Sequence, residues 1–301
     1  MSESSQPAAS GPRIWFLGAR PRTLPAAFVP VAVGGACAAG NGSAVWWRLA
    51  LALVVSVALQ VGVNYANDYS DGVRGTDDNR VGPMRLVGSG AASPSAVKNA
   101  AFACFGVAAV AGLVLAVATS WWLLAVGAAA IVSAWTYTGG PRPYGYAGLG
   151  EVFVFVFFGT VATVGSQYVV TENITPTAWI SSVAVGSYAC ALLVINNLRD
   201  IPGDTVAGKR TLAVKLGDVA TRKFFALLVL VSVAAVVATS VTAGPFALLG
   251  LVGVFTIKPS LDAIARGARG QALVPVLGAV GKSQLMFGVT YTVGLALSLG
   301  S

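Results

Sequence analysis

The sequence predicts an all-α polytopic membrane protein with nine transmembrane helices. Of its 301 residues, 56% are hydrophobic and only 10% are charged, whereas soluble globular domains carry about 25% charged residues. Apolar runs long enough to cross a bilayer recur along the whole chain. Glycine is abundant, with 36 residues, as close packing of helices in lipid favours. The bilayer must therefore be part of the solvent of this chain.

Each transmembrane helix needs about 20 mostly apolar residues. Nine stretches fit, at residues 24–40, 49–66, 97–118, 121–138, 150–170, 178–197, 224–242, 245–260 and 283–300. Residues 1–12 are polar and small, and we expect a disordered N-terminal tail there. The first apolar run is followed by many more, so we expect it to be the first span of a polytopic protein and not a cleavable signal peptide. Residues 13–301 are therefore expected to form a single transmembrane domain.

The basic residues predict the orientation. If the N-terminus is inside, every lysine and arginine except Arg48 falls in an inside segment. This asymmetry predicts an N-in, C-out topology in the cytoplasmic membrane. The net charge of +8 does not indicate nucleic-acid binding, because the basic residues lie between apolar spans and form no continuous stripe. Histidine is absent, which excludes histidine-based catalysis and histidine metal sites.

Most of the acidic residues fall in two inside segments. The first follows the second span and reads Asn64-Tyr-Ala-Asn67-Asp68-Tyr-Ser-Asp71-Gly-Val-Arg74-Gly-Thr-Asp77-Asp78. Asn67 and Asp71 are four residues apart and share a helix face, and Asn64 and Asp68 form a second such pair.

The second acidic segment follows the sixth span and repeats this spacing. It reads Asn196-Asn197-Leu-Arg199-Asp200-Ile-Pro202-Gly-Asp204. Asn196 and Asp200 are again four residues apart, and Asp204 lies four residues further on. We expect Pro202 to end or kink the helix.

Both segments follow even-numbered spans and so lie at the same membrane face. Magnesium prefers oxygen ligands and is usually held by one or two carboxylates together with substrate phosphates. We therefore predict a catalytic magnesium site with a bridging diphosphate, in which Asn67 takes part and the metal ligands are Asp68, Asp71, Asp77, Asp200 and Asp204. The alternative is two solvated loops with capping and turn residues. The matched spacing argues against it, because acidic residues at membrane depth are costly and usually functional.

Cationic and polar residues near these segments are candidates for binding substrate, because they can neutralise a departing diphosphate. The candidates are Arg22, Asn64, Arg74, Arg80, Arg85, Tyr137, Arg142, Tyr144, Asn196, Asn197, Lys209 and Arg210. The assignments of Tyr137, Tyr144 and Arg22 have an alternative. The tyrosines between spans four and five also suit an interfacial aromatic belt, and Arg22 also suits an inside anchor before span one.

The two acidic segments closely resemble the signature motifs of the UbiA superfamily of intramembrane prenyltransferases. The first family motif has the form Asn-x3-Asp-x3-Asp. Asn67 and Asp71 match it, whereas position 75 is glycine and Asp77 follows two residues later. This departure resembles the MenA branch, as do the segments that begin Arg80-Val-Gly-Pro-Met-Arg85, Tyr137-Thr-Gly-Gly-Pro and Ala207-Gly-Lys209-Arg210. The second motif matches in full, at Asn196, Asp200 and Asp204.

The resemblance covers nearly the whole chain, from Arg20 to the last span. It implies nine helices in a ring around a central cavity that opens to the membrane, with the active site at the cytoplasmic side. It also implies a magnesium-dependent transfer of a polyprenyl group from its diphosphate to 1,4-dihydroxy-2-naphthoate, with loss of carbon dioxide and diphosphate, in menaquinone biosynthesis.

Two alternative functions stay open. One is prenylation of another aromatic acceptor such as 4-hydroxybenzoate. The other is a cation-coupled membrane transporter, because acidic residues among membrane helices also mark ion pathways. The clustering of the acids at one membrane face, and not in the middle of the spans, argues against a transporter.

Overall fold

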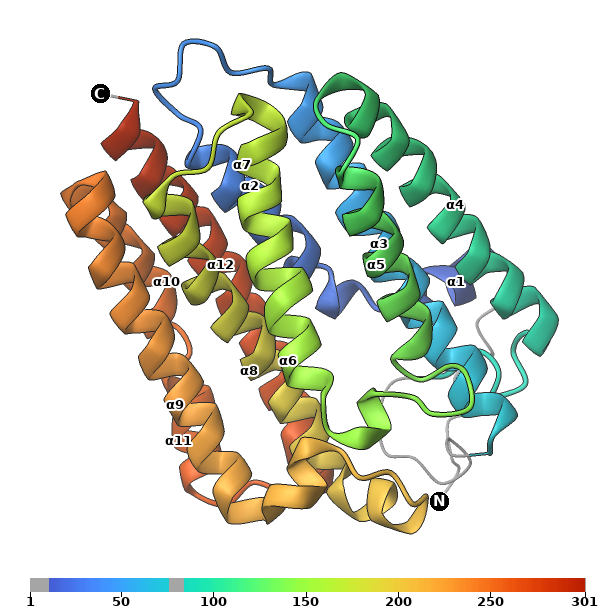
Figure 1. The fold of residues 1–301 in the computed structure, drawn as a ribbon. Helices are drawn as coiled ribbons and strands as arrows, with labels where there is room; N and C mark the ends of the chain where they lie inside the picture. Colours follow the sequence, from blue (N-terminus) through green and yellow to red (C-terminus); the bar gives the residue numbers. More distant parts are fainter. Residues whose placement is uncertain (1–10, 76–83, 301) are drawn as a thin grey trace.

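The computed structural model describes residues 11–75 and 84–300, and every regular element within them is a helix (Figure 1). In chain order the helices are α1 (Pro12–Gly18), η1 (Pro21–Thr23), α2 (Pro25–Ala36), α3 (Trp47–Val73), α4 (Pro94–Ala118), α5 (Leu123–Thr136), η2 (Gly145–Ala147), α6 (Gly150–Val154), η3 (Phe155–Val161), α7 (Ala162–Thr171), α8 (Pro176–Val206), α9 (Leu212–Ala243), η4 (Pro245–Leu249), α10 (Gly250–Phe255), α11 (Lys258–Ala265), η5 (Gly270–Ala272) and α12 (Leu273–Leu299). The expected tail at residues 1–12 lies outside the described residues, apart from its last two.

Six helical stretches are long and apolar enough to cross a membrane. They are α3, α4, the continuous stretch Gly150–Thr171, α8, α9 and Gly270–Leu299. The pair Pro245–Phe255 and Lys258–Ala265, bent by 44°, would make a seventh, and α2 and α5 are shorter apolar helices. A helix therefore lies over each of the nine predicted stretches, and the chain is a multi-pass membrane protein. The number of nine crossings stays a prediction.

Three of the long helices begin at a capping side chain. The hydroxyls of Ser93, Thr175 and Thr211 accept hydrogen bonds from backbone N–H groups in the first turns of α4, α8 and α9. Of the two outcomes predicted for Pro202, that it ends the helix is wrong, because α8 continues to Val206. Proline removes only one backbone hydrogen bond from the helix, and α8 continues for one more turn beyond it.

Helix α8 is the central element of the bundle. In its apolar stretch 78% of the residues are buried, against 28% in α3. It packs against α9 and α12. Tyr188 of α8 stacks with Phe287 of α12, which stacks in turn with Tyr291 of the same helix. The Tyr291 hydroxyl meets Ser181 at 2.8 Å, so the buried polar group is satisfied.

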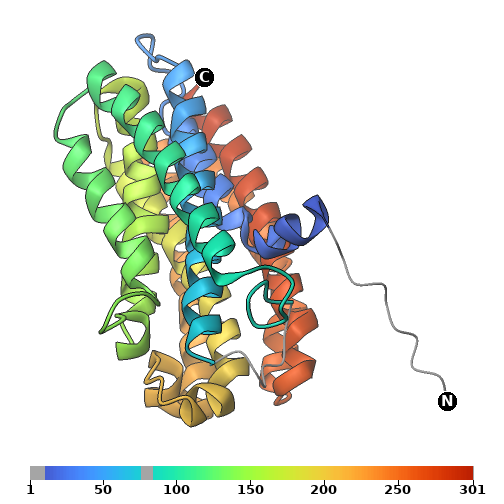
Figure 2. The same cartoon turned by 90° about the vertical axis from the view of Figure 1, so that its right-hand side faces the viewer.

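The second side of the bundle is built by α3, α4 and α5. Figures 1 and 2 show them beside the group formed by α2, α7, α8 and α12, with the short α1 lying across the long helices. Large apolar side chains such as Val110, Leu230 and Phe255 are exposed on the outer faces of the helices. Exposed apolar surface on this scale is what a lipid-facing bundle presents.

Arg48 ties three helices together at one end of the bundle. Its guanidinium donates to the Ala118 carbonyl at 2.7 Å, to the Val169 carbonyl at 3.3 Å and to the Glu172 carboxylate at 2.7 Å. The two carbonyls lie at the C-terminal ends of α4 and α7, where backbone acceptors have no partner within the helix. Arg48 lies in the first turn of α3 and Asp71 lies near its other end, so about 35 Å of helix separates them.

A glycine pair sets how closely η3 approaches α8. A Cβ atom added to Gly159 would lie 2.6 Å from the Cα atom of Gly186, so a methyl group forces the two helices apart. We expect Gly159→Ala to destabilise the fold by about 1–3 kcal/mol, which a thermal unfolding measurement in detergent detects. Gly106→Ala is the matched control, because it faces open space in α4 and alanine favours helix. An equal loss in both variants would contradict the packing argument.

Candidate functional site

A cavity of about 1330 Å³ lies between the two sides of the bundle. Its wall is built by residues from α1, η1, α2–α8 and α12 and from the loops that follow α3, α5 and α8. Pockets for drug-sized ligands measure about 300–1,000 Å³. The cavity therefore suits a larger substrate.

One end of the cavity is polar and the other is apolar. Asp71, Asp200 and Asp204 line the polar end, whereas Leu115 and Leu123 line the apolar arm. A ladder of aromatic rings leads along the wall from Tyr137 to Tyr144, Phe153 and Phe157, with ring centroids 5.5, 3.9 and 6.1 Å apart. The cavity can thus receive a molecule with a charged head and a long apolar tail.

Asp71 joins the first acidic segment to the loop after the second. Its Oδ1 atom accepts from the Lys209 ammonium at 2.9 Å and from the Tyr146 hydroxyl at 2.5 Å. The Arg85 guanidinium lies 3.8 Å from Oδ2. The carboxylate is nearly buried, and its negative charge is matched by two cations from different segments.

Burial alone lowers the pKa of Lys209, but the facing Asp71 carboxylate more than offsets this and raises the pKa above its ordinary value. The ammonium is therefore charged at neutral pH. Burial, together with the charge of Asp71, raises the pKa of Tyr146. Tyr146 is therefore a neutral hydrogen-bond donor, and the Lys209 ammonium lies 4.7 Å above its ring.

Asp200 forms a bidentate ion pair with its sequence neighbour Arg199. Two guanidinium nitrogens donate to the two carboxylate oxygens, each at 2.7 Å, and a third contact of 2.8 Å reaches the Asn196 side-chain oxygen. This fork is nearly buried on the arginine side, where only 1% of the side chain is exposed. Asn196, Asp200 and Asp204 share one face of α8 and all line the cavity.

Asn67 is fixed by the turn that follows α5. Its side-chain oxygen accepts from the Thr138 hydroxyl at 2.7 Å. The Arg74 guanidinium donates to the carbonyls of Thr138 and Gly140. The last turns of α3 and the 138–140 turn are thereby held as one unit at the polar end of the cavity.

The cavity brings most of the predicted site residues together. Its wall contains Arg22, Asn64, Asn67, Asp71, Arg74, Arg85, Tyr137, Tyr144, Asn196, Asn197, Asp200, Asp204 and Lys209. Within this set, the Asn197 side-chain NH₂ donates to the buried Glu151 carboxylate at 2.9 Å. One of its donors is therefore already used within the protein. Asp77 and Arg80 lie outside the described residues.

Three predicted residues lie away from the cavity wall. Arg142 and Arg210 have exposed side chains, although the Arg210 backbone N–H donates to the Tyr146 carbonyl. Asp68 is fully buried, and its carboxylate accepts from the backbone N–H groups of Leu86 and Val87 at 2.8 and 2.9 Å. In the structure Asp68 therefore holds a turn and does not face the cavity.

Sequence reasoning missed several residues of the wall, among them Arg20, Thr23, Gln60, Thr138 and Arg199. One signal was available, since Gln60 lies four residues before Asn64 and shares its helix face. Arg199 stands between two predicted residues, but its fork with Asp200 depends on side-chain geometry. Thr23 reaches the wall only through the tertiary packing of η1 against α3, which no local pattern reveals.

The donor set fits magnesium held jointly with a diphosphate. Within residues 11–75 and 84–300 no three His, Cys, Asp or Glu side chains come together as a metal cage. Single carboxylates from two helices that face one cavity are instead the arrangement magnesium accepts when phosphates supply further oxygens. Asp71 on α3 and Asp200 and Asp204 on α8 are the residues placed to hold it.

Comparison with known proteins identifies relatives along nearly the whole chain. The sequence model of the UbiA prenyltransferase family matches residues 27–269. The chain is 49% identical over 283 residues to a 1,4-dihydroxy-2-naphthoate octaprenyltransferase of Mycobacterium tuberculosis, covering 94% of this chain and 96% of the relative. It is 38% identical over 230 residues to the Escherichia coli protein of the same name, covering 72% of each.

Solved structures share the fold at low sequence identity. A UbiA homolog from Aeropyrum pernix K1 superposes with a TM-score of 0.69 at 16% identity, covering 90% of this chain and 97% of that one. A UbiA homolog from Archaeoglobus fulgidus, solved with DMAPP and Mg²⁺, gives a TM-score of 0.62 at 15% identity, covering 94% and 99%. At this level of sequence identity, the similarity supports a shared fold for the helical bundle.

Proposed function

This chain belongs to the UbiA prenyltransferase family, and from that premise we propose that it transfers a polyprenyl group from polyprenyl diphosphate to 1,4-dihydroxy-2-naphthoate. The products are demethylmenaquinol, carbon dioxide and diphosphate. The observation that carries the proposal is the 49% identity, over 94% of the chain, to a relative of that activity. The cavity supports it independently, because it combines an acidic and cationic end with a long apolar arm.

We assign the diphosphate and its magnesium to the polar end. Asp71, Asp200 and Asp204 are the proposed metal ligands, and Lys209 and Arg85 are placed to contact phosphate oxygens. In the segment after α3, Asp77 stays a candidate metal ligand and Arg80 a candidate contact for the diphosphate. Magnesium bound there with the diphosphate supplies positive charge that stabilises the negative charge developing on the leaving group.

The chain itself orients and shields the reacting atoms. The allylic C–O bond breaks and its electron pair leaves with the diphosphate. The ladder of Tyr137, Tyr144, Phe153 and Phe157 presents aromatic faces to the developing allylic cation. The apolar arm holds the tail and excludes water, which would otherwise capture the cation.

The naphthoate ring then forms a C–C bond to the allylic carbon. When the ring carbon attacked is the one that carries the carboxylate, release of carbon dioxide returns the bonding pair to the ring and restores aromaticity. No side chain then has to accept a proton, in keeping with a sequence that has no histidine.

We further propose that residues 13–301 form one transmembrane domain with nine crossings, N-in and C-out, in the cytoplasmic membrane. The positions of the basic residues support this, since only Arg48 falls in an outside segment. Arg48 also lies at the opposite end of α3 from Asp71. The diphosphate end of the cavity then faces the cytoplasm, where soluble substrates arrive.

The test is turnover by the purified protein in lipid. We expect a prenylated naphthoquinol and carbon dioxide from 1,4-dihydroxy-2-naphthoate, geranylgeranyl diphosphate and magnesium. Excess EDTA is expected to abolish the product, and added magnesium to restore it, because the carboxylates alone leave the diphosphate charge unmatched. Mass spectrometry identifies the product.

The other outcomes are equally informative. Product with 4-hydroxybenzoate and none with the naphthoate would overturn the acceptor while keeping the family's chemistry. Full turnover in EDTA would overturn the magnesium assignment.

A further inference from the structure

A stripe of polar side chains runs along the cavity face of α3. Gln60, Asn64, Asn67 and Asp71 follow one another at intervals of four, three and four residues, so they share one face of the helix. Asp71 marks the diphosphate end. With a rise of about 1.5 Å per residue, Asn64 lies ~10 Å and Gln60 ~16 Å along the axis from Asp71. An aromatic ring next to the allylic carbon would lie beside Asn64 and Gln60.

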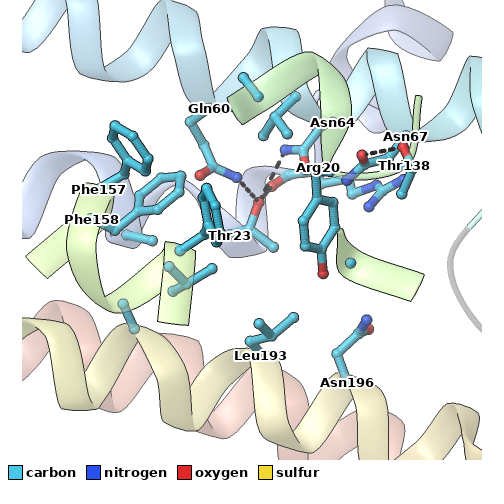
Figure 3. Close-up of a pocket in the computed structure, with 18 of the residues that line it drawn as sticks. Arg20, Thr23, Gln60, Asn64, Asn67, Thr138, Phe157, Phe158, Leu193 and Asn196 are labelled. Carbon is cyan, nitrogen blue, oxygen red and sulfur yellow. Dashed lines mark hydrogen bonds between the residues drawn. The ribbon is translucent and has the colours of Figure 1, made fainter. Parts of the chain in front are cut away.

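The orientation of both amides is fixed by one hydroxyl. The Thr23 hydroxyl has a single proton, and it donates that proton to the Arg20 carbonyl at 2.9 Å. Thr23 must therefore accept at its other contacts, from Gln60 Nε2 at 3.1 Å and from Asn64 Nδ2 at 3.2 Å (Figure 3). Asn64 Nδ2 also donates to the Ala19 carbonyl at 2.9 Å. Both amides thus direct nitrogen at the η1 turn and turn their oxygens away from it.

The turn that holds the amides is itself constrained. Arg20 has φ 54° and ψ 70°, in the left-handed region that arginine rarely adopts. Such conformations persist only where the surroundings fix them, and they gather at ligand-binding sites. The Arg20 carbonyl accepts from both the hydroxyl and the backbone N–H of Thr23, and the neighbouring Ala19 carbonyl accepts from Asn64, so these contacts help to hold the turn. Gln60 is 6% exposed and Asn64 4% exposed, and both line the cavity, so their small remaining exposure is to the cavity.

We propose that the side-chain oxygens of Gln60 and Asn64 accept hydrogen bonds from the two ring hydroxyls of a para-dihydroxy aromatic acceptor. Residues four apart on a helix lie about 5–6 Å apart at Cβ, which is comparable with the distance between hydroxyls on opposite corners of one ring. The inference rests on the proposed function, which supplies such a diol. It deepens that function by naming the residues that recognise the aromatic acceptor.

The same contacts help the reaction. An amide oxygen that accepts a hydroxyl proton in a hydrogen bond leaves more electron density on the ring oxygen and hence on the ring. The ring is then a better nucleophile toward the allylic cation. Amides fixed in advance by Thr23 need no reorganisation when the acceptor binds.

The experiment removes the proposed hydrogen bond in two ways: by deleting a hydroxyl from the acceptor and by replacing the Gln60 amide. The full-length protein is saturated with an unreactive prenyl thiolodiphosphate. The Kd values of 1,4-dihydroxy-2-naphthoate, 1-hydroxy-2-naphthoate and 4-hydroxy-2-naphthoate are then measured on wild type and Gln60→Met. In wild type we expect loss of the partnered hydroxyl to raise Kd about tenfold, because a buried acceptor is left without its donor. In Gln60→Met the same deletion is expected to change Kd less than about twofold.

Ser56→Ala is the matched control. Ser56 lies one turn before Gln60 on α3, lines the same cavity and donates to the Ala27 carbonyl at 2.9 Å. It should keep the wild-type hydroxyl dependence. Unchanged Kd for the thiolodiphosphate reports an intact fold in each variant, and Gln60→Ala repeats the measurement without added bulk.

The outcomes separate the two levels of inference. If wild type turns over the naphthoate diol, but hydroxyl deletion costs the same factor in wild type and both Gln60 variants, the amide subsite is overturned and the proposed function stands. If wild type turns over no diol at all, the proposed function itself fails.

Discussion

Replacing Asp71 or Asp200 by asparagine is expected to lower turnover at least about a hundredfold while the protein stays folded. Each substitution removes a negative charge from the polar end of the cavity and leaves a cation, Lys209 or Arg199, facing a neutral amide. Loss of one electrostatic contact to the group on which charge develops typically costs 10²–10³ in rate, a range taken from oxyanion-hole variants. Initial rates with saturating magnesium and prenyl diphosphate measure the effect.

The control must separate lost catalysis from a disturbed ion pair. Asp262→Asn removes a carboxylate from an exposed pair with Lys258, at 2.8 Å, away from the cavity, and exposed pairs contribute little. It should retain turnover within about twofold. The double variant Asp71→Asn with Lys209→Met removes the carboxylate together with the nearer of its two cations, so it should regain part of the lost stability without regaining activity. Near-normal turnover in both Asp71→Asn and Asp200→Asn would refute the two-sided magnesium site.

The spacing of the two acidic segments predicted the polar end of this cavity better than any other feature. Asn67 and Asp71, and likewise Asn196 and Asp200, are four residues apart, and helical periodicity alone places each pair on one face. The structure shows both faces lining one cavity. Their roles as ligands stay predictions that the asparagine variants test.

The sequence did not determine which loop side chains point into the cavity, because that depends on tertiary packing. Arg142 and Arg210 lie in loops next to the site, and a loop position does not determine whether a side chain points inward; both are exposed. Thr23 contacts Gln60 and Asn64 across 37 and 41 residues of chain. Such contacts follow from how η1 packs on α3, and no local periodicity encodes it.

Asp68 is the clearest case in which motif and geometry suggest different roles. It sits next to Asn67 in the acidic segment, but successive helical residues are rotated by about 100°. The stripe formed by Gln60, Asn64, Asn67 and Asp71 faces the cavity, whereas Asp68 points at the turn that contains Leu86. There its carboxylate accepts hydrogen bonds from the backbone N–H groups of Leu86 and Val87, which would otherwise lack this partner.

Asp68→Asn is therefore expected to destabilise the protein by about 1–3 kcal/mol. The asparagine side chain has one oxygen and one NH₂ group, so one backbone N–H of Leu86 or Val87 would face another donor. Thermal unfolding in detergent measures the loss, with Asp262→Asn as the control that should unfold as wild type does.

The magnesium dependence of Asp68→Asn distinguishes two roles for Asp68: an anchor, which holds the turn that contains Leu86, and a direct magnesium ligand. The turn held by Asp68 carries Arg85, which lies 3.8 Å from Asp71, so loosening it should lower turnover through a misplaced cation. An anchor predicts a lower unfolding temperature and a reduced rate that extra magnesium does not restore. A direct metal ligand predicts instead that the magnesium concentration for half-maximal rate rises well above the wild-type value. Asp71→Asn should show that rise, because Asp71 lies on the cavity-facing stripe, whereas Asp68→Asn should keep the wild-type magnesium dependence.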